Sequence, residues 1–278
     1  MYRVAARCML PIAVFVIYLC GSLWLFATAW RHDNPRVVHG KLLAGLSMAS
    51  LAVLVHGYML CRAIFRGPEL ALNTTDVASL VGWIIAAIAL LTTWQRPRFA
   101  SLGAALLLGV GIAAAITDDG SRKFVIEQSG WELTTHILVA IVAYSLIAIG
   151  AVFAIALWAL DRRLRQHRPL GFLTVLPSVE ALEAAMFQAI KAGFALLTLA
   201  LFSGFVFVQD LFAQHLVHKV LLSCLAWLIL GILLLGRWRL GWRGRTAARW
   251  ALGGFVLLGL AYFGAKIVLE VVLGRHWG

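Results

Sequence analysis

Charged residues are scarce in this chain. Asp, Glu, Lys and Arg together make up 13% of its 278 residues, whereas 62% of the residues are hydrophobic. Soluble domains carry roughly 25% charged and roughly 45–50% apolar residues. The surface of a water-soluble protein needs more charge than this, so hydrocarbon is the expected solvent. The formal net charge of +12 does not indicate nucleic-acid binding, because most basic residues flank apolar runs, where they meet anionic lipid.

Paired cysteines and soluble-enzyme motifs are missing too. Cys8, Cys20, Cys61 and Cys224 stand apart with no CxxC pair, which excludes a thiol redox motif and covalent haem attachment through CxxCH. The sequence contains no Gly-rich phosphate loop, HExxH or GxSxG motif. No apolar run carries the series of acids expected of a proton relay or the spaced arginines of a voltage sensor. With no catalytic constellation visible, we expect no enzyme.

Long apolar runs fill the chain instead. A helix needs ~20 apolar residues to cross a hydrocarbon core ~30 Å thick, and continuous runs of this length cross lipid as helices. Eight runs meet this requirement: 9–30, 42–61, 77–94, 99–116, 133–158, 189–208, 218–236 and 248–273. The predicted fold is an all-α integral membrane protein, a bundle of about eight transmembrane helices. Since the longest gap, 159–188, is too short for an ordinary soluble domain, we expect one polytopic domain over 1–278.

The gap before the sixth run contains an amphipathic segment, SVEALEAAMFQAIKAGF. Ser178 suits the N-cap position, and apolar residues follow it at helical spacing from Val179 to Ile190. Glu180 and Glu183 lie off this apolar stripe, near the positive end of the helix dipole. We expect a short interfacial amphipathic helix before span six, with a simple N-terminal extension of span six as the equal alternative.

Basic residues in the loops predict the orientation. Eight spans put both termini on one side, whose loops hold eight Lys and Arg residues against fourteen on the other side. By the positive-inside rule the richer side is cytoplasmic, so both termini are predicted on the outer, periplasmic side of a bacterial inner membrane. Arg3 and Arg7 indicate the opposite orientation, but Arg31, Arg36 and Lys41 outweigh them. We expect the first span to be retained as a helix.

Histidine is the ionisable residue whose positions suggest chemistry. Three of the eight histidines lie beside arginines in predicted cytoplasmic loops and should be solvated. The other five map to the outer half of the predicted bundle: His56, His136, His215, His218 and His276. A neutral imidazole ligates iron, zinc or copper, and haem needs only one or two axial ligands within apolar and aromatic walls. The spacing does not support a zinc site. The alternative for each is an interfacial polar residue with a hydrogen-bond partner.

A family resemblance begins at His136. The segment THILVAIVAYSLIAIGAVFAIALWALDRRLR contains His136 and Tyr144 as H-x7-Y, on adjoining faces of a helix with 3.6 residues per turn. It resembles the span before the signature domain of the CcsA/ResC family of cytochrome c assembly proteins. Further similar stretches are LPSVEALEAAMFQAIKAGFALLTLALFSG, HKVLLSCLAW, GWRGR and LAYFGAKIV, so that the resemblance covers roughly 130–270. The chain looks closer still to the shorter HemX/YpjD-type branch.

This resemblance implies a haem-associated inner-membrane protein of the cytochrome c assembly superfamily. Such a protein would hold or handle haem at the outer face of the membrane. Carried over by position, His136 matches the first outer histidine of haem-handling relatives, His276 falls near the second, and His56 resembles an intramembrane one. The implied cofactor is haem, with His136 and His276 as ligands of its iron, and Trp131 and Tyr144 would help to shape the pocket.

The sequence departs from the haem-handling pattern at one loop. The tryptophan-rich WGxxWxWD segment is missing, and VQDLFAQHLVHK occupies its place. The histidine expected near the end of span seven is also absent, where the sequence reads LLLGRWR. These losses favour an alternative, a haem-free accessory or regulatory subunit that binds another membrane or assembly protein through residues 159–188 or its spans. A small-solute transporter would need inverted repeats and broken helices, which are not evident.

Overall fold

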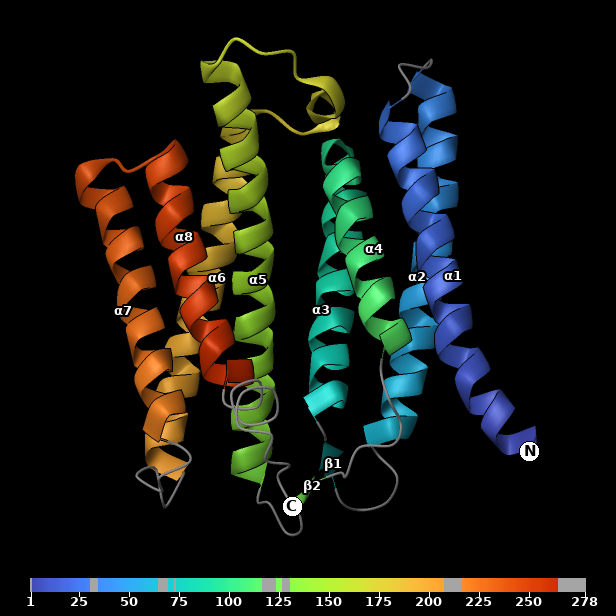
Figure 1. The fold of residues 1–278 in the computed structure, drawn as a ribbon, viewed down its shortest axis with the longest axis vertical. Helices are drawn as coiled ribbons and strands as arrows, with labels where there is room; N and C mark the ends of the chain where they lie inside the picture. Colours follow the sequence, from blue (N-terminus) through green and yellow to red (C-terminus); the bar gives the residue numbers. More distant parts are fainter. Residues whose placement is uncertain are drawn as a thin grey trace. The chain divides into compact units, whose positions relative to one another are not determined.

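The computed structural model describes residues 2–30, 35–64, 70–72, 74–116, 124–126, 131–207 and 217–264. Within these residues there are eight α-helices (Figure 1). The chain forms two compact units. Unit 1 comprises Met1–Ser129 and Phe172–Pro177, and unit 2 comprises Gly130–Gly171 and Ser178–Gly278. That the chain is one polytopic membrane domain stays a prediction.

Unit 1 contains the first four helices. They are α1 (Tyr2–Trp30), α2 (Pro35–Ile64), α3 (Thr74–Gln95) and α4 (Ala100–Ile116), with a 3₁₀ turn at Pro97–Phe99 between α3 and α4. Helix α1 packs against α2 and α4, and α3 packs against α4. A Cβ added at Gly111 would lie 2.9 Å from the Cβ of Tyr18. The missing side chain at Gly111 thus lets α4 approach α1 closely.

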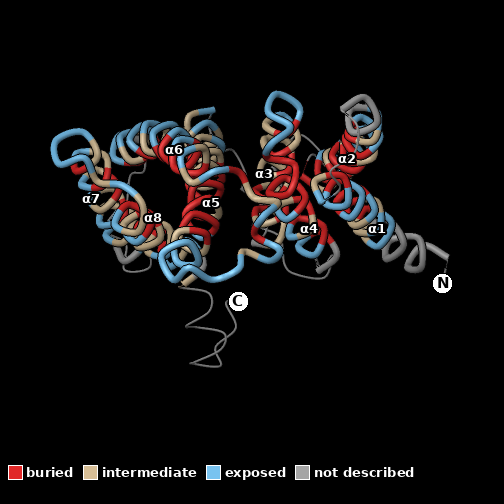
Figure 2. Tube along the Cα trace, turned by 90° about the horizontal axis from the view of Figure 1, so that it is seen from above, coloured by how far each residue is buried: buried red, intermediate tan, exposed pale blue. Residues whose placement is uncertain are grey.

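The core of unit 1 combines small and large apolar side chains. Its fully buried members include Val14, Tyr18, Leu25, Ala49, Ala52, Ala86, Ala104 and Leu107. Figure 2 shows the buried residues along the facing sides of these helices. Alanines let neighbouring helix backbones come close. Helices in lipid associate through such close packing, because the hydrophobic effect does not drive them together there.

Two short strands were not expected from the sequence. Strand β1 (Leu70–Leu72) pairs antiparallel with β2 (Phe124–Ile126), with Leu70 opposite Ile126 and Leu72 opposite Phe124. Both are three-residue apolar pieces in unit 1, one after α2 and one after α4. Their backbone groups lie outside any helix, and pairing satisfies them. The two-stranded ladder is a minor addition to an otherwise helical fold.

Unit 2 contains the remaining helices. They are α5 (Trp131–Arg165), α6 (Val179–Phe207), α7 (Val217–Leu240) and α8 (Gly244–Gly259), which continues as a π-helical turn at Leu260–Gly264. Helix α5 packs along α6 and α8, and α7 packs against α8 and α6. Ile190 of α6 lies where a Cβ on Gly150 of α5 would meet it, at 2.7 Å from its Cγ1. Helices α5 and α6 therefore pack closely against each other.

Among the residues that the structure describes, seven helices are long and apolar enough to cross a membrane. They cover Pro11–Trp30, Gly40–Ile64, Thr75–Gln95, Pro97–Ala114, Trp131–Arg165, Val179–Val206 and Lys219–Leu240. These correspond to the first seven predicted spans, and the all-α membrane class is confirmed. The eighth predicted span, 248–273, begins within α8, and its part beyond Gly264 lies outside the described residues.

The amphipathic segment before span six is part of α6. The helix runs without a break from Val179 to Phe207, so the N-terminal extension is formed and a separate interfacial helix is not. Ser178 acts as the N-cap, since its Oγ accepts a hydrogen bond from the Ala181 N–H at 3.3 Å. Leu182, Met186 and Ile190 are buried. The apolar stripe packs inside unit 2, which explains why the segment does not lie flat as its own helix.

Candidate functional site

His136 lies in the second turn of α5 and contacts α6. Its ring is half-buried, and its Nδ1 lies 2.9 Å from the Oγ of Ser203. Ser203 stands one turn before the end of α6 at Phe207. The two helices run side by side, so their ends bring together residues that are 67 positions apart in the sequence.

The donor and acceptor roles in the His136–Ser203 bond depend on the tautomer of His136. Ser203 Oγ also lies 3.0 Å from the carbonyl oxygen of Ala200, which can only accept. If the single hydroxyl proton serves this carbonyl, Ser203 accepts from His136 and the imidazole proton lies on Nδ1. In the neutral ring, Nε2 then carries the free lone pair. A histidine that ligates a metal has this arrangement, with its other nitrogen donating to a fixed acceptor.

Gly204 provides room for the His136 ring. A Cβ on Gly204 would lie 3.1 Å from the Cε1 of His136 and 3.9 Å from its Nε2. The Cε1 edge of the ring therefore lies against the backbone of α6, and Nε2 lies farther from it. Sequence reasoning missed Ser203 and Gly204. The SG pair in LFSG is visible in the sequence, but nothing local pairs it with His136.

Tyr144 and Trp131 have other surroundings. The ring of Tyr144 lies 5.8 Å from that of Phe255 and 6.2 Å from that of Tyr262, so it faces α8 and the turn that follows. His136 and Tyr144 thus lie on different faces of α5, as the eight-residue spacing predicts. Trp131 begins α5 and is 73% exposed. The described contacts do not bring either residue to the His136 ring.

His56 lies in unit 1 and is 2% exposed. Its Nδ1 lies 3.2 Å from the hydroxyl of Tyr18, and its Nε2 lies 2.9 Å from the Oγ of Ser79. Both hydroxyls can donate or accept, so either tautomer satisfies both nitrogens. An iron ion would have to displace one of these bonds. The geometry is that of a buried polar group satisfied within its own unit.

The other outer histidines are described in part or not at all. His215 and His276 lie outside the described residues, and so does the side chain of His218. Among the residues whose side chains are described, no three of the types His, Cys, Asp and Glu gather around a point that could hold a metal ion. The pairing of His136 with His276 stays a prediction.

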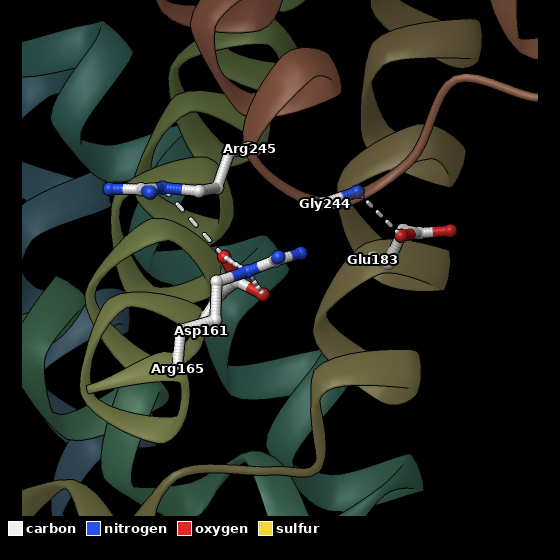
Figure 3. Close-up of polar contacts among 5 residues, drawn as sticks. All are labelled: Asp161, Arg165, Glu183, Gly244 and Arg245. Atoms are coloured by element: carbon white, nitrogen blue, oxygen red, sulfur yellow. Dashed lines mark hydrogen bonds and ion pairs between the residues drawn. The ribbon is translucent and has the colours of Figure 1, made fainter. Parts of the chain in front are cut away.

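A second polar cluster lies at the opposite end of unit 2. Glu183 of α6 is buried, and its carboxylate accepts from Arg237 and Arg243, with nitrogen–oxygen distances of 2.8 and 3.0 Å. It also accepts the backbone N–H of Gly244 at 2.9 Å (Figure 3). Glu183 therefore joins α6 to the end of α7 and the start of α8. The expectation that Glu183 lies off the buried face is wrong, because the turn between α7 and α8 folds over it.

A comparison with known protein families identifies the family to which the chain belongs. Residues 44–273 match the family described as Cytochrome C assembly protein. The chain belongs to this family. The match covers both units and confirms the resemblance seen from His136 onward.

Individual relatives agree with this assignment. The chain is 34% identical to the inner membrane protein YpjD of Escherichia coli strain K12 over 140 residues, which are 50% of this chain and 53% of YpjD. It is 33% identical over 171 residues to an uncharacterized 28.8 kDa protein of Azospirillum brasilense, covering 60% and 63% of the two chains. It is 23% identical to the cytochrome c biogenesis protein CcsA of Synechococcus sp. strain CC9902, over 93% of both.

The matches differ in how much they cover. The chain spans about half the length of the YpjD relatives that it matches. No solved structure matches the chain. Family membership and the multi-pass membrane fold therefore rest on the family match and on the helices themselves, while haem handling, partners and orientation are matters for proposal.

Proposed function

We propose that this protein binds haem at the outer face of the bacterial inner membrane, with Nε2 of His136 as an axial ligand of the iron. The basic loops predict this orientation, with both termini on the periplasmic side. The inner membrane is the location printed for the YpjD relative. His276 is the second proposed ligand, carried over from the family resemblance.

The observation that carries the proposal is the hydrogen-bond chain from His136 to Ala200. Ser203 Oγ lies within hydrogen-bond distance of both His136 Nδ1 and the Ala200 carbonyl. In the proposed tautomer His136 Nδ1 donates to Ser203, and Ser203 donates to this carbonyl. This chain fixes the ring orientation and leaves the lone pair on Nε2, as an axial ligand requires. His56 offers no such nitrogen, because Tyr18 and Ser79 engage both of its ring atoms. The residues around His136 therefore fit one axial ligand, and those around His56 do not.

The protein would hold and orient the porphyrin without making a covalent bond to it. Haem would supply the redox and transfer chemistry. His136 would bind, Ser203 would hold the ring at one angle, and Gly204 would leave space beside the Cε1 edge of the ring. Trp131 and Tyr144 are proposed pocket residues, one at the start of α5 and one on its α8-facing side.

Visible spectroscopy of the full chain in detergent tests the proposal. Haemin is titrated into the wild type, into His136→Ala and into His167→Asn, which removes an exposed loop imidazole at a φ of 49° that asparagine tolerates. We expect a Soret shift in the wild type and in the control, and its loss in His136→Ala. Added imidazole should restore the band in His136→Ala, which shows that the variant is folded. An unchanged band in His136→Ala would overturn the assignment.

The missing tryptophan loop favours one other function. A haem-free accessory or regulatory subunit needs no haem platform, and VQDLFAQHLVHK has no tryptophan. Such a subunit would bind a membrane or assembly protein through 159–188 or its spans. Affinity purification in mild detergent distinguishes the two functions. A stoichiometric protein partner in a preparation that shows no Soret band, lost when the arginines of 162–168 are neutralised, would establish the accessory role.

A further inference from the structure

We propose that the end of unit 2 formed by the last turn of α5 and the first turns of α8 binds the phosphate of an anionic phospholipid. The site is independent of the proposed haem function, because it lies at the other end of α5. His136 and Asp161 are 25 residues apart in this helix, which corresponds to about 37 Å at 1.5 Å per residue. One helix thus has a polar group at each face of a hydrocarbon core ~30 Å thick.

Positive charge exceeds negative charge at this end. Asp161 pairs with Arg165 at 2.9 Å, and its Oδ2 lies 3.7 Å from the Nε of Arg245 (Figure 3). Arg162 has no carboxylate partner among the described residues, and neither does Arg249, which stands one turn after Arg245 on the same face of α8. Two arginines therefore lie beside the Asp161 carboxylate and two more have none in the described part of the chain, so an anion would relieve their mutual repulsion.

Two of these arginines contact the ring of the same tryptophan. The guanidinium carbon of Arg162 lies 5.4 Å from the ring centroid of Trp158, and that of Arg245 lies 6.0 Å from the same centroid. Both contacts are within cation–π range. Two like charges are thus held beside one ring, from different helices. A phosphate accepts hydrogen bonds from several guanidinium groups at once, often two from each.

Arg245 has hydrogen-bonding capacity that the protein does not use. Its Nε is buried, and within the described residues this nitrogen has no hydrogen-bond partner. The side chain as a whole stays partly open to its surroundings. Asp161 is close enough to attract it but not to accept its N–H, because 3.7 Å exceeds hydrogen-bond distance. A small rotation toward an added phosphate would satisfy this group.

The apolar and aromatic residues at the end of α7 indicate a lipid phosphate and not a free one. Trp238 and Leu240 at the end of α7 are 74% and 70% exposed, and Arg239 lies over the Trp238 ring at 4.5 Å. Tryptophan beside arginine marks the level of lipid headgroups. Basic pockets between transmembrane helices on the cytoplasmic side bind anionic headgroups, and this end is the predicted cytoplasmic one. The occupant we assign is a phosphatidylglycerol or cardiolipin headgroup.

Native mass spectrometry of the full chain tests this site. The protein is exchanged from detergent with phosphatidylglycerol, cardiolipin or phosphatidylcholine, and retained lipid is counted. We expect the wild type to retain the anionic lipids, and Arg162→Gln/Arg249→Gln to lose this preference about tenfold, or ~1.4 kcal/mol. Arg163→Gln/Arg168→Gln is the matched control, because it removes the same charge from exposed positions near the same end of α5. It should retain the preference.

Three results would overturn the site. Equal losses in the two double variants would show a diffuse charge effect and no site. Inorganic phosphate that displaces the lipid at equal concentration would show a soluble anion site. A stoichiometric protein that copurifies on these arginines would show a protein interface. If the first double variant does not fold, Arg162→Lys/Arg249→Lys replaces it, which keeps the charge but removes the planar fork and should weaken retention.

Discussion

Ser203 Oγ and His136 Nδ1 lie 2.9 Å apart although 67 residues separate them in the sequence. The bond connects α5 with α6 near the predicted outer face and engages one of the two ring nitrogens. Because Ser203 also bonds the Ala200 carbonyl, a change of tautomer at His136 rearranges both hydrogen bonds. The predictions below begin with this pair.

Ser203→Ala should weaken haem binding without abolishing it. Partners that orient a metal-bound histidine change metal affinity roughly 10–100-fold when they are removed. We therefore expect a rise in the haemin dissociation constant of about tenfold or more, measured by Soret titration. Ser145→Ala is the control, since its hydroxyl bonds the Ile141 carbonyl of its own helix. An affinity equal to that of the wild type in Ser203→Ala would contradict the orienting role.

Gly204→Ala should also weaken haem binding. The new Cβ would lie 3.1 Å from His136 Cε1, which is closer than van der Waals contact, so the ring must shift by a few tenths of an ångström. The expected readout is a lower haemin affinity together with a changed Soret position, because the His136 ring would be held at a different place. Gly253→Ala adds the same atom where nothing lies within 4 Å and should bind haem normally.

Removing His56 should lower stability and leave the Soret band in place. Tyr18 and Ser79 would lose the acceptor and donor that His56 provides, and a buried polar group left unsatisfied costs about 1–3 kcal/mol. The melting temperature of His56→Ala in detergent should fall, while haemin titration should match the wild type. Disappearance of the band with an unchanged melting temperature would instead make His56 a ligand.

Glu183→Gln should destabilise unit 2. The carboxylate binds Arg237, Arg243 and the backbone N–H of Gly244, and an amide cannot accept all of these bonds as a charged group does. We expect a loss of about 1–3 kcal/mol, since both arginines stay partly exposed to water. Thermal unfolding in detergent measures it. Glu180→Gln, on an exposed position one turn earlier, should melt as the wild type does.

Local sequence was enough to predict the helices and the angle between the His136 and Tyr144 side chains. The length of an apolar run sets whether a helix can cross lipid, so each span could be predicted without its neighbours. The angle between two positions on a helix depends only on their spacing. That His136 and Tyr144 point in different directions follows from that angle, whereas helix packing puts His136 against α6 and Tyr144 against α8.

Partners from distant helices could not be predicted in this way. Glu183 was expected to lie off the apolar stripe of its own helix, and therefore away from the buried face. Its burial depends on Arg243 and Gly244, which approach only after α7 and α8 have packed. The β1–β2 pairing likewise joins segments on either side of two helices, and no local pattern sets that register.

The sequence by itself determined a chain of apolar helices, the residue types available for haem and the side of the membrane on which basic loops should lie. These properties depend only on composition and on residue spacing along the polypeptide chain. Tertiary structure decided that Ser203 bonds Nδ1 of His136, and that Tyr18 and Ser79 bond the two ring nitrogens of His56. The reason is physical: a hydrogen bond depends on which atoms meet, and helix packing brings those atoms together.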